Sequence, residues 1–282
     1  MAPHARLGDE VRTGSWSEIS GRDEPSWYLD PVVAEQKRTV HLGVCRRWSP
    51  DGVRRALKTD LFEEAFGDDA LLPDLLGASE IWLAMDLAPG TVRKARLRAR
   101  RPVPQFLAAD ARGLPLRTAS LDLVLSTSTL DHFDSRREFV AAISEIARVL
   151  RPGGRLVLTI DNPSNPLYWP LRWLGRTRWV PFPFGYSPSG PRLREMLADA
   201  GLEVIACETL IHNPRIVSTV LFLALRRLLH SRADRAIRGL LAAFEVLERL
   251  PTRGLTACFL ATCAVRSTMP PHNSSAPDVL RT

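Results

Sequence analysis

Residues 114–154 read LPLRTASLDLVLSTSTLDHFDSRREFVAAISEIARVLRPGG, and this stretch predicts a strand followed by a helix. Its segment 121–126 (LDLVLS) is a short apolar run of branched side chains, which is typical of a strand buried on both faces. Ser135 and Glu138 then have the spacing of a capping box at a helix N-terminus. Apolar side chains recur every three or four residues over 139–150, so the helix should present one apolar stripe to a core.

A second buried strand is predicted after this helix. Gly153 and Gly154 can end the helix in a left-handed turn, and residues 155–160 (RLVLTI) are again apolar and branched. A strand, a helix and a strand in this order form a right-handed parallel unit. The carboxyl ends of the two strands, at Ser126 and Asp161, are therefore expected to open onto one crevice.

Five more strands are predicted outside this unit, three before it and two after it. They are residues 53–62, 81–86, 104–110, 202–210 and 256–265. Helical patterns separate most of them, including a basic helix over 91–101. Strands that alternate with helices favour an α/β fold. We therefore predict a Rossmann-like, doubly wound sheet of seven mostly parallel strands, with helices on both faces.

The chain is expected to form a single domain with loose ends. Residues 1–24 are polar and lack periodicity, which predicts a flexible arm, and residues 267–282 resemble such an arm at the other end. The domain between them spans residues 25–266. Its additions to the sheet are an N-terminal helix in 25–52, an aromatic insert in 162–191 and a helical elaboration in 214–250. The insert suits either a substrate lid or a packed excursion over the core.

Composition and charge favour an ordinary globular protein that acts on small molecules. Of the 282 residues, 45% are hydrophobic and 24% are charged, which is enough for a sizeable core. The net charge of +7 is dispersed, so steeply salt-dependent binding to nucleic acid is not expected. The cysteines show neither a CxxC pair nor zinc-site spacing, and buried free thiols are predicted for all of them. They are Cys45, Cys207, Cys258 and Cys263.

Nothing in the sequence predicts a signal peptide or a membrane-spanning helix, so a cytoplasmic protein is expected. One run, 217–225 (VSTVLFLAL), is apolar enough to touch a membrane surface. Packing of one helix on another explains this run more simply. The oligomeric state is left open.

Three acidic residues end three successive predicted strands. They are Asp60, Asp86 and Asp110, and the intervals of 26 and 24 residues each correspond to about one strand and helix. Because the carboxyl ends of parallel strands share one rim, these side chains are expected to converge. An Asp after the second strand can bind both hydroxyls of a ribose, and an Asp after the third can accept from an adenine amine.

Four runs, taken in order, resemble the class I S-adenosylmethionine-dependent methyltransferases of the small-molecule, type 11-like kind. They are 84–90 (AMDLAPG), 109–115 (ADARGLP), 121–126 (LDLVLS) and 149–154 (VLRPGG). The likeness covers roughly residues 53–266. It implies the fold predicted above, S-adenosyl-L-methionine as cofactor, and a last strand inserted antiparallel.

The resemblance also implies roles for individual residues. Cofactor binding would fall to Asp60, Asp86, Leu87, Asp110, Ala111 and Ser126. The acidic residue after the second strand would hold the ribose, and Asp110 with Ala111 would hold the adenine. The region of Ser126 would flank the methionine portion. His132 falls where many members carry a histidine after the fourth strand.

The loop after the first strand departs from the family. Its sequence, 60–67 (DLFEEAFG), has Phe62 and Glu64 where the family has glycines that admit the cofactor's amino-acid tail. Either the loop is rearranged, with Glu64 or Lys58 contacting the tail, or the cofactor binds poorly. A nicotinamide site is less favoured still, because no GxGxxG follows the first strand.

His132 is the candidate catalytic base, because an imidazole titrates near neutral pH. A capping or packing role beside Asp131 and Asp134 is the alternative. The prediction is a methyltransferase acting on a small, possibly apolar metabolite through an oxygen or nitrogen acceptor. The competing prediction is a degenerate protein of the same fold that serves as a binding or assembly partner.

Overall fold

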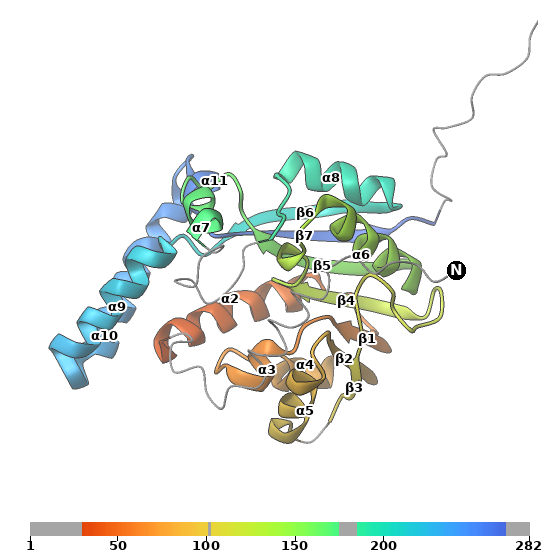
Figure 1. Cartoon of the computed structure of the whole chain (residues 1–282), viewed down its shortest axis with the longest axis horizontal. Helices are drawn as coiled ribbons and strands as arrows, with labels where there is room; N and C mark the ends of the chain where they lie inside the picture. Colours follow the sequence, from red (N-terminus) through yellow and green to blue (C-terminus); the bar gives the residue numbers. More distant parts are fainter. Residues whose placement is uncertain (1–29, 101–102, 175–184, 269–282) are drawn as a thin grey trace, which may run out of the picture.

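The computed structural model describes residues 30–100, 103–174 and 185–268. Within these residues, seven strands form one sheet in the order β3-β2-β1-β4-β5-β7-β6 (Figure 1). Strands β1 to β5 are parallel, and β7 lies antiparallel between β5 and β6. Their bounds are β1 Arg55–Lys58, β2 Ile81–Asp86, β3 Gln105–Ala108, β4 Leu121–Thr127, β5 Leu150–Asp161, β6 Leu202–Leu210 and β7 Phe259–Arg266. The predicted Rossmann-like fold, including the antiparallel last strand, is confirmed.

Helices cover both faces of this sheet. Their bounds are α2 Pro31–Trp48, α3 Phe62–Phe66, α4 Leu72–Leu75, α5 Pro89–Arg98, α6 Arg136–Val149, α7 Tyr168–Leu174, α8 Gly190–Asp199, α9 Arg215–Leu229, α10 Ala233–Glu245 and α11 Arg253–Thr256. On one face α6 and α8 pack against β4 and β5, and on the other α2, α4 and α5 pack against β1 and β2. Successive residues of a strand point to opposite faces of the sheet and so belong to different cores. In β4, Val124 lies in the core under α6 and α8, and Leu123 lies in the core under α2, α4 and α5.

The helix that follows β4 begins as the sequence predicts, but it ends at Val149 with Leu150 already extended, so the expectation that Gly153 and Gly154 end it is wrong. Ser135 caps α6 by accepting from the Glu138 backbone N–H, and the Glu138 carboxylate accepts from the Ser135 backbone N–H at 3.1 Å. Phe139, Ile143 and Ile146 are fully buried on its inner face. Gly153 adopts a φ of +78°, a left-handed conformation that suits glycine, where the chain turns into the straight part of β5.

Helices α9 and α10 form a hairpin that projects from one end of the molecule (Figure 1). Their facing sides enclose a small third core with the start of α2, built around Val32, Phe222 and Ile237. This hairpin corresponds to the predicted helical elaboration. Among the described residues, none of the helices combines the length and the apolar character that crossing a bilayer demands.

Three local expectations need correction or fall outside the structure. The first strand is shorter than predicted, because the chain turns at Thr59 and enters α3 at Phe62. Cys207 is exposed rather than buried, because β6 is the edge strand of the sheet. The predicted N-terminal arm, residues 175–184 of the aromatic insert and most of the predicted tail lie outside the described residues.

Candidate functional site

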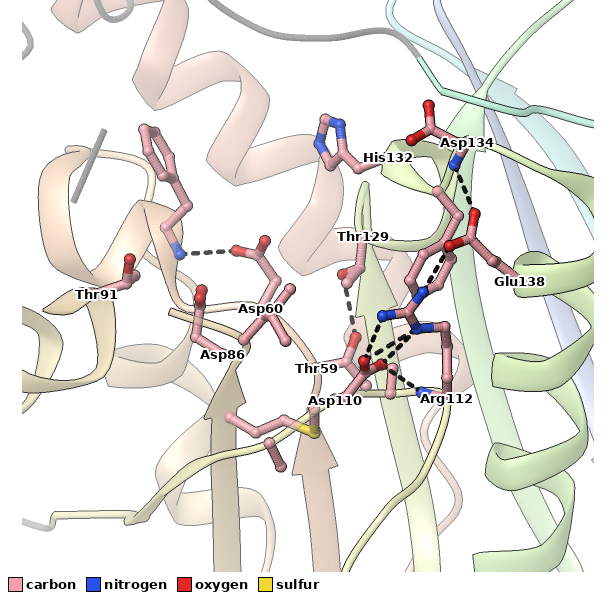
Figure 2. A pocket seen from close by; sticks show the side chains of 16 residues that line it. Thr59, Asp60, Asp86, Thr91, Asp110, Arg112, Thr129, His132, Asp134 and Glu138 are labelled. Carbon is pink, nitrogen blue, oxygen red and sulfur yellow. Dashed lines mark hydrogen bonds and ion pairs between the residues drawn. The ribbon is translucent and has the colours of Figure 1, made fainter. Parts of the chain in front are cut away.

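A cavity lies at the carboxyl ends of strands β1 to β4 (Figure 2). It contains about 910 Å³ of empty space, including the part open to solvent. Its lining residues are Thr59, Asp60, Phe62, Met85, Asp86, Leu87, Thr91, Ala109, Asp110, Ala111, Arg112, Thr129, His132, Phe133, Asp134 and Glu138. All three strand-end carboxylates identified in the sequence therefore meet at one cavity.

Asp86 is the last residue of β2, and two backbone N–H groups fix its carboxylate. Oδ1 accepts from the N–H of Ala88 at 2.8 Å, and Oδ2 accepts from the N–H of Leu61 at 3.2 Å. The second bond ties the end of β2 to the loop after β1. Burial raises the pKa of Asp86 above its ordinary value, although these N–H donors oppose the shift.

Asp60 lies in the loop after β1, next to Asp86 in the cavity wall (Figure 2). Its Oδ1 accepts from the N–H of Phe62 at 2.8 Å, which fixes the carboxylate at the start of α3. Burial raises the pKa of Asp60, and the neighbouring carboxylates of Glu63 and Asp86 raise it further. The two carboxyl groups lie side by side in the cavity wall, where hydroxyl donors or a cationic ligand would favour their charged forms.

Asp110 is already engaged by a neighbouring arginine. The Arg112 guanidinium donates to both of its oxygens, with Nε to Oδ1 at 3.1 Å and Nη2 to Oδ2 at 2.7 Å. Another guanidinium nitrogen, Nη1, donates to Glu138 at 2.5 Å. Arg112 thus links the loop after β3 to α6, and it leaves Ala111 beside it as a small apolar part of the wall.

The loop after β1 is held by a buried ion pair. The Lys58 side chain is fully buried, and its Nζ donates to Glu64 Oε2 at 2.9 Å and to the Asp60 carbonyl at 2.5 Å. Glu64 Oε1 also accepts from the N–H groups of Leu71 and Leu72, both at 3.2 Å. Lys58 and Glu64 therefore compensate each other's charge behind the loop. Neither side chain is among the residues that line the cavity, so contact of either one with the amino-acid tail of a cofactor stays a prediction.

A second lysine extends this charged cluster. Lys37 of α2 pairs with Glu63 at 3.1 Å and with Asp69 at 2.7 Å. Burial alone raises the pKa of Glu63, but the ammonium groups of Lys37 and Lys58 more than offset it and hold the pKa well below its ordinary value. The N-terminal helix is thereby tied to the loop that carries Asp60.

The lining residues suit the nucleoside part of the family's cofactor. The wall on the side of its amino-acid tail differs from that of the family. Carboxylates at Asp60 and Asp86 can accept from ribose hydroxyls, and Met85 with Ala111 offers apolar surface for a base. Phe62 stands in the wall where a glycine would leave open space. With this ring in place about 910 Å³ remains empty, the part open to solvent included, so Phe62 changes the wall on the amino-acid side without filling the cavity.

His132 lines the cavity from the loop after β4, and a network fixes that loop. The N–H of Gly185 donates to the Asp131 carbonyl at 2.9 Å, and the N–H of Tyr186 donates to the Phe133 carbonyl at 2.6 Å. Asp131 Oδ2 accepts from the N–H of Asp161 at 2.8 Å. The imidazole thus sits on a short turn that is held from both sides, at the upper edge of the view in Figure 2.

Ser126 differs from the other residues implied by the resemblance. It is fully buried, and its hydroxyl accepts from Thr59 Oγ1 at 3.0 Å. Thr59 stands in front of it as a lining residue, and its Oγ1 also lies 3.1 Å from Thr129 Oγ1. Ser126 therefore supports the wall instead of forming it.

Several lining residues were missed by the sequence reasoning. Thr59 and Thr129 flank residues that were identified, and hydroxyls next to a strand end were their only signal. Arg112 follows Asp110 by two residues, a spacing at which a side-chain pair in a turn is common but not specific. Glu138 was assigned only to the helix cap, yet it also faces the cavity.

Comparisons with known proteins agree with this geometry. The family described as "Methyltransferase domain" matches residues 65–158. An O-methyltransferase of Pyrenophora dematioidea is 30% identical over 51% of this chain and 52% of its own length. A phthiotriol/phenolphthiotriol dimycocerosates methyltransferase of Mycobacterium leprae is 32% identical, over 57% of each chain. The chain thus spans about half the length of these curated relatives.

A solved structure extends the likeness to nearly the whole fold. The N-methyltransferase NodS of Bradyrhizobium japonicum, solved with S-adenosyl-L-homocysteine, superposes with a TM-score of 0.55. The superposition covers 91% of this chain and 98% of that one, at 13% identity, so it bears on the fold alone. The family match, the two curated relatives and the order of strands in the sheet all point to the same family. Residues 65–158 match a methyltransferase domain, and the chain is similar in sequence and in fold to the class I S-adenosylmethionine-dependent methyltransferases.

Proposed function

We propose that this protein transfers the methyl group of S-adenosylmethionine to a hydroxyl of a small, apolar acceptor. The observation that supports this most is the single cavity that gathers Asp60, Asp86 and Asp110 at the sheet rim, with His132 in the same wall. A crevice at the carboxyl ends of a doubly wound sheet is where such folds bind nucleotides.

The cofactor would be held mainly by residues of the β1, β2 and β3 ends. Asp86, whose orientation two N–H groups fix, would accept from the ribose hydroxyls, with Leu87 beside it. Ala111 would pack on the adenine, and Asp110, held by Arg112, would orient that wall. Asp60 would balance the positive charge of the ligand. When bound, S-adenosylmethionine supplies an activated methyl group.

The protein's own contribution would be to orient the acceptor and remove its proton. Reaction at an activated methyl group depends mainly on alignment of the two reactants. A hydroxyl acceptor also loses a proton, and a ring nitrogen of His132 would take it up. Thr129 and Phe133 line the same part of the wall and would bound the space for the acceptor.

The acceptor class is supported by the relatives and by the described part of the aromatic insert. One curated relative is named an O-methyltransferase, and the other is named for dimycocerosates of phthiotriol and phenolphthiotriol. In this chain the Tyr168 hydroxyl donates to the Gly185 carbonyl at 3.2 Å, and Tyr186 packs edge-on against Phe139. The described part of the insert is therefore packed over the core next to the His132 turn, where it would shape the acceptor side.

Calorimetric titration with S-adenosylmethionine and S-adenosylhomocysteine tests cofactor binding. Asp86→Asn should weaken both ligands roughly tenfold to a hundredfold, because it removes a charged hydrogen-bond acceptor. Asp51→Asn, a change in an exposed turn, is the matched control and should leave the affinity unchanged. Equal effects of the two variants would contradict the assigned role of Asp86.

Turnover tests the second half of the proposal. With a panel of hydroxylated apolar acceptors and radiolabelled cofactor, His132→Asn should lower kcat roughly a hundredfold or more while cofactor affinity stays unchanged. His230→Asn, at an exposed helix end, serves as the control. Absence of heat in the cofactor titration would favour the alternative of a binding or assembly partner, which Phe62 in place of a glycine motivates.

A further inference from the structure

The α9–α10 hairpin has an inner side fixed by packing and ion pairs. Phe222 and Ile237 are buried against the first turn of α2. The guanidinium of Arg226 pairs with Asp30, the cap of α2, with Nε 2.6 Å from Oδ2. Arg238 pairs with Glu35 of the same helix at 2.9 Å. The inner side of the hairpin is therefore packed against the body, and its outer side faces away from it.

The outer side of α9 carries exposed apolar side chains. On α9, Val220, Leu223 and Leu228 are spaced by three and five residues and are 63%, 61% and 77% exposed. This spacing places them opposite Phe222, the residue that packs inward. On α10, Val246 just past its end is 53% exposed. Side chains of this size are seldom grouped on a free surface without a function.

The hairpin and the segment after it are basic. Residues 215–256 contain eight arginines and three acidic residues, a net charge of +5 for this segment. Arg227, Arg232 and Arg235 are exposed. Because Arg227 follows Leu223 by four residues, a cationic and an apolar side chain are neighbours on the outer side of α9.

Exposed tryptophans lie at the base of the hairpin. Trp169 and Trp173 of α7 are 59% and 68% exposed. The segment before α7 is tied to the α11 region, since Asn165 Nδ2 donates to the Thr256 carbonyl at 3.3 Å (Figure 1). Leu255 of α11 is also exposed. Tryptophan is enriched where proteins meet the interface of a lipid bilayer.

We propose that the outer side of the α9–α10 hairpin docks this protein on an anionic lipid surface. Val220, Leu223 and Leu228 would enter the boundary between headgroups and acyl chains, as the apolar side of an interfacial helix does. Arg227 and Arg235 would contact lipid phosphates. A second copy of the chain is a poorer occupant, because it would bring two surfaces of the same positive charge together.

Vesicle co-sedimentation of the full chain tests this proposal. The protein should partition onto vesicles that contain phosphatidylglycerol at least tenfold more strongly than onto vesicles of phosphatidylcholine alone, and added salt should weaken that binding. Leu223→Ser with Leu228→Ser, or Arg227→Glu with Arg235→Glu, should reduce partitioning about tenfold or more. All four positions are exposed, so the fold should persist, and thermal melting checks this.

Matched controls come from the exposed basic helix α5. Leu97→Ser and Arg96→Glu make the same chemical changes at exposed positions of another surface, and they should leave partitioning within twofold of the parent. The proposal is overturned if the parent protein shows no preference for the anionic vesicles, or if the α5 variants lose as much binding. It is also overturned if the protein is a dimer in solution that Leu223→Ser dissociates.

Discussion

Replacement of Lys58 by methionine tests how the loop after β1 is held. The Lys58 ammonium is fully buried and lies 2.9 Å from Glu64 and 3.6 Å from Glu63. Its pKa is raised because these carboxylates outweigh the effect of burial, so it is charged in the folded protein. Methionine fills a similar volume but leaves two buried carboxylates with less compensation.

The expected loss follows from the burial of this group. Removal of one partner of a buried ion pair costs about 3–5 kcal/mol, because the other charge stays buried. Lys37 remains 3.1 Å from Glu63 and offsets part of that cost. We therefore expect a loss of about 3 kcal/mol in unfolding free energy, which for a chain of this size corresponds to roughly 10 °C in melting temperature. Binding of S-adenosylhomocysteine should also weaken, because Lys58 holds the Asp60 carbonyl.

Urea unfolding of three variants gives the measurement. Lys58→Met should be strongly destabilised, whereas Arg192→Met, which breaks an exposed pair with Glu195, should cost at most about 1 kcal/mol. Glu64→Gln keeps an oxygen for the N–H groups of Leu71 and Leu72. Combined with Lys58→Met, it should cost at least about 1 kcal/mol less than the sum of the single changes.

Two results would refute this reasoning. One is a Lys58→Met protein that loses no more stability than Arg192→Met, which would mean that the buried ammonium is not compensating the carboxylates. The other is strict additivity of Lys58→Met and Glu64→Gln, which would show that the two side chains do not interact.

Three more predictions concern helix α2, the cap of α6 and the turn that carries His132. His41 is buried with its pKa lowered to about 4 from 6.5, so its contribution to stability is present above pH 6.5 and is lost as pH falls toward 4. Over that window unfolding free energy should fall by up to about 3 kcal/mol in the parent and less in His41→Leu, and identical slopes in urea titrations would contradict this. Ser135→Ala removes the α6 cap and should lower unfolding free energy by about 1 kcal/mol, whereas Ser120→Ala, away from any helix start, should cost less. Gly185→Ala would place a Cβ 2.3 Å from the Phe133 carbonyl oxygen, so methyl transfer should fall together with thermal stability, and a variant that matches the parent in both would disprove the tight turn.

The sheet was predictable because the sequence patterns of its strands and helices are local and recur along the chain. Buried strands contain short branched runs, 121–126 in β4 and 155–160 in β5, and the capping box at Ser135 fixes where α6 begins. Three acidic residues at strand ends were enough to predict a shared cavity, since parallel strands deliver their carboxyl ends to one rim.

The contacts within the site were less predictable because they join residues from different elements. The Lys58–Glu64 pair depends on how α3 packs behind the loop, and both residues were candidates for the opposite, ligand-facing role. Every residue of β4 is buried, so the burial pattern could not show that Ser126 lies behind Thr59. The exposure of Cys207 depends on strand order, which places β6 at the edge of the sheet.

A crystal structure of the protein with S-adenosylhomocysteine tests the central claim most directly. We predict one ligand in the cavity, with its ribose hydroxyls within hydrogen-bond distance of the Asp86 carboxylate and its adenine beside Ala111. A ligand bound elsewhere, or a cavity that stays empty in crystals soaked at saturating concentration, would contradict the assignment of these strand ends to cofactor binding.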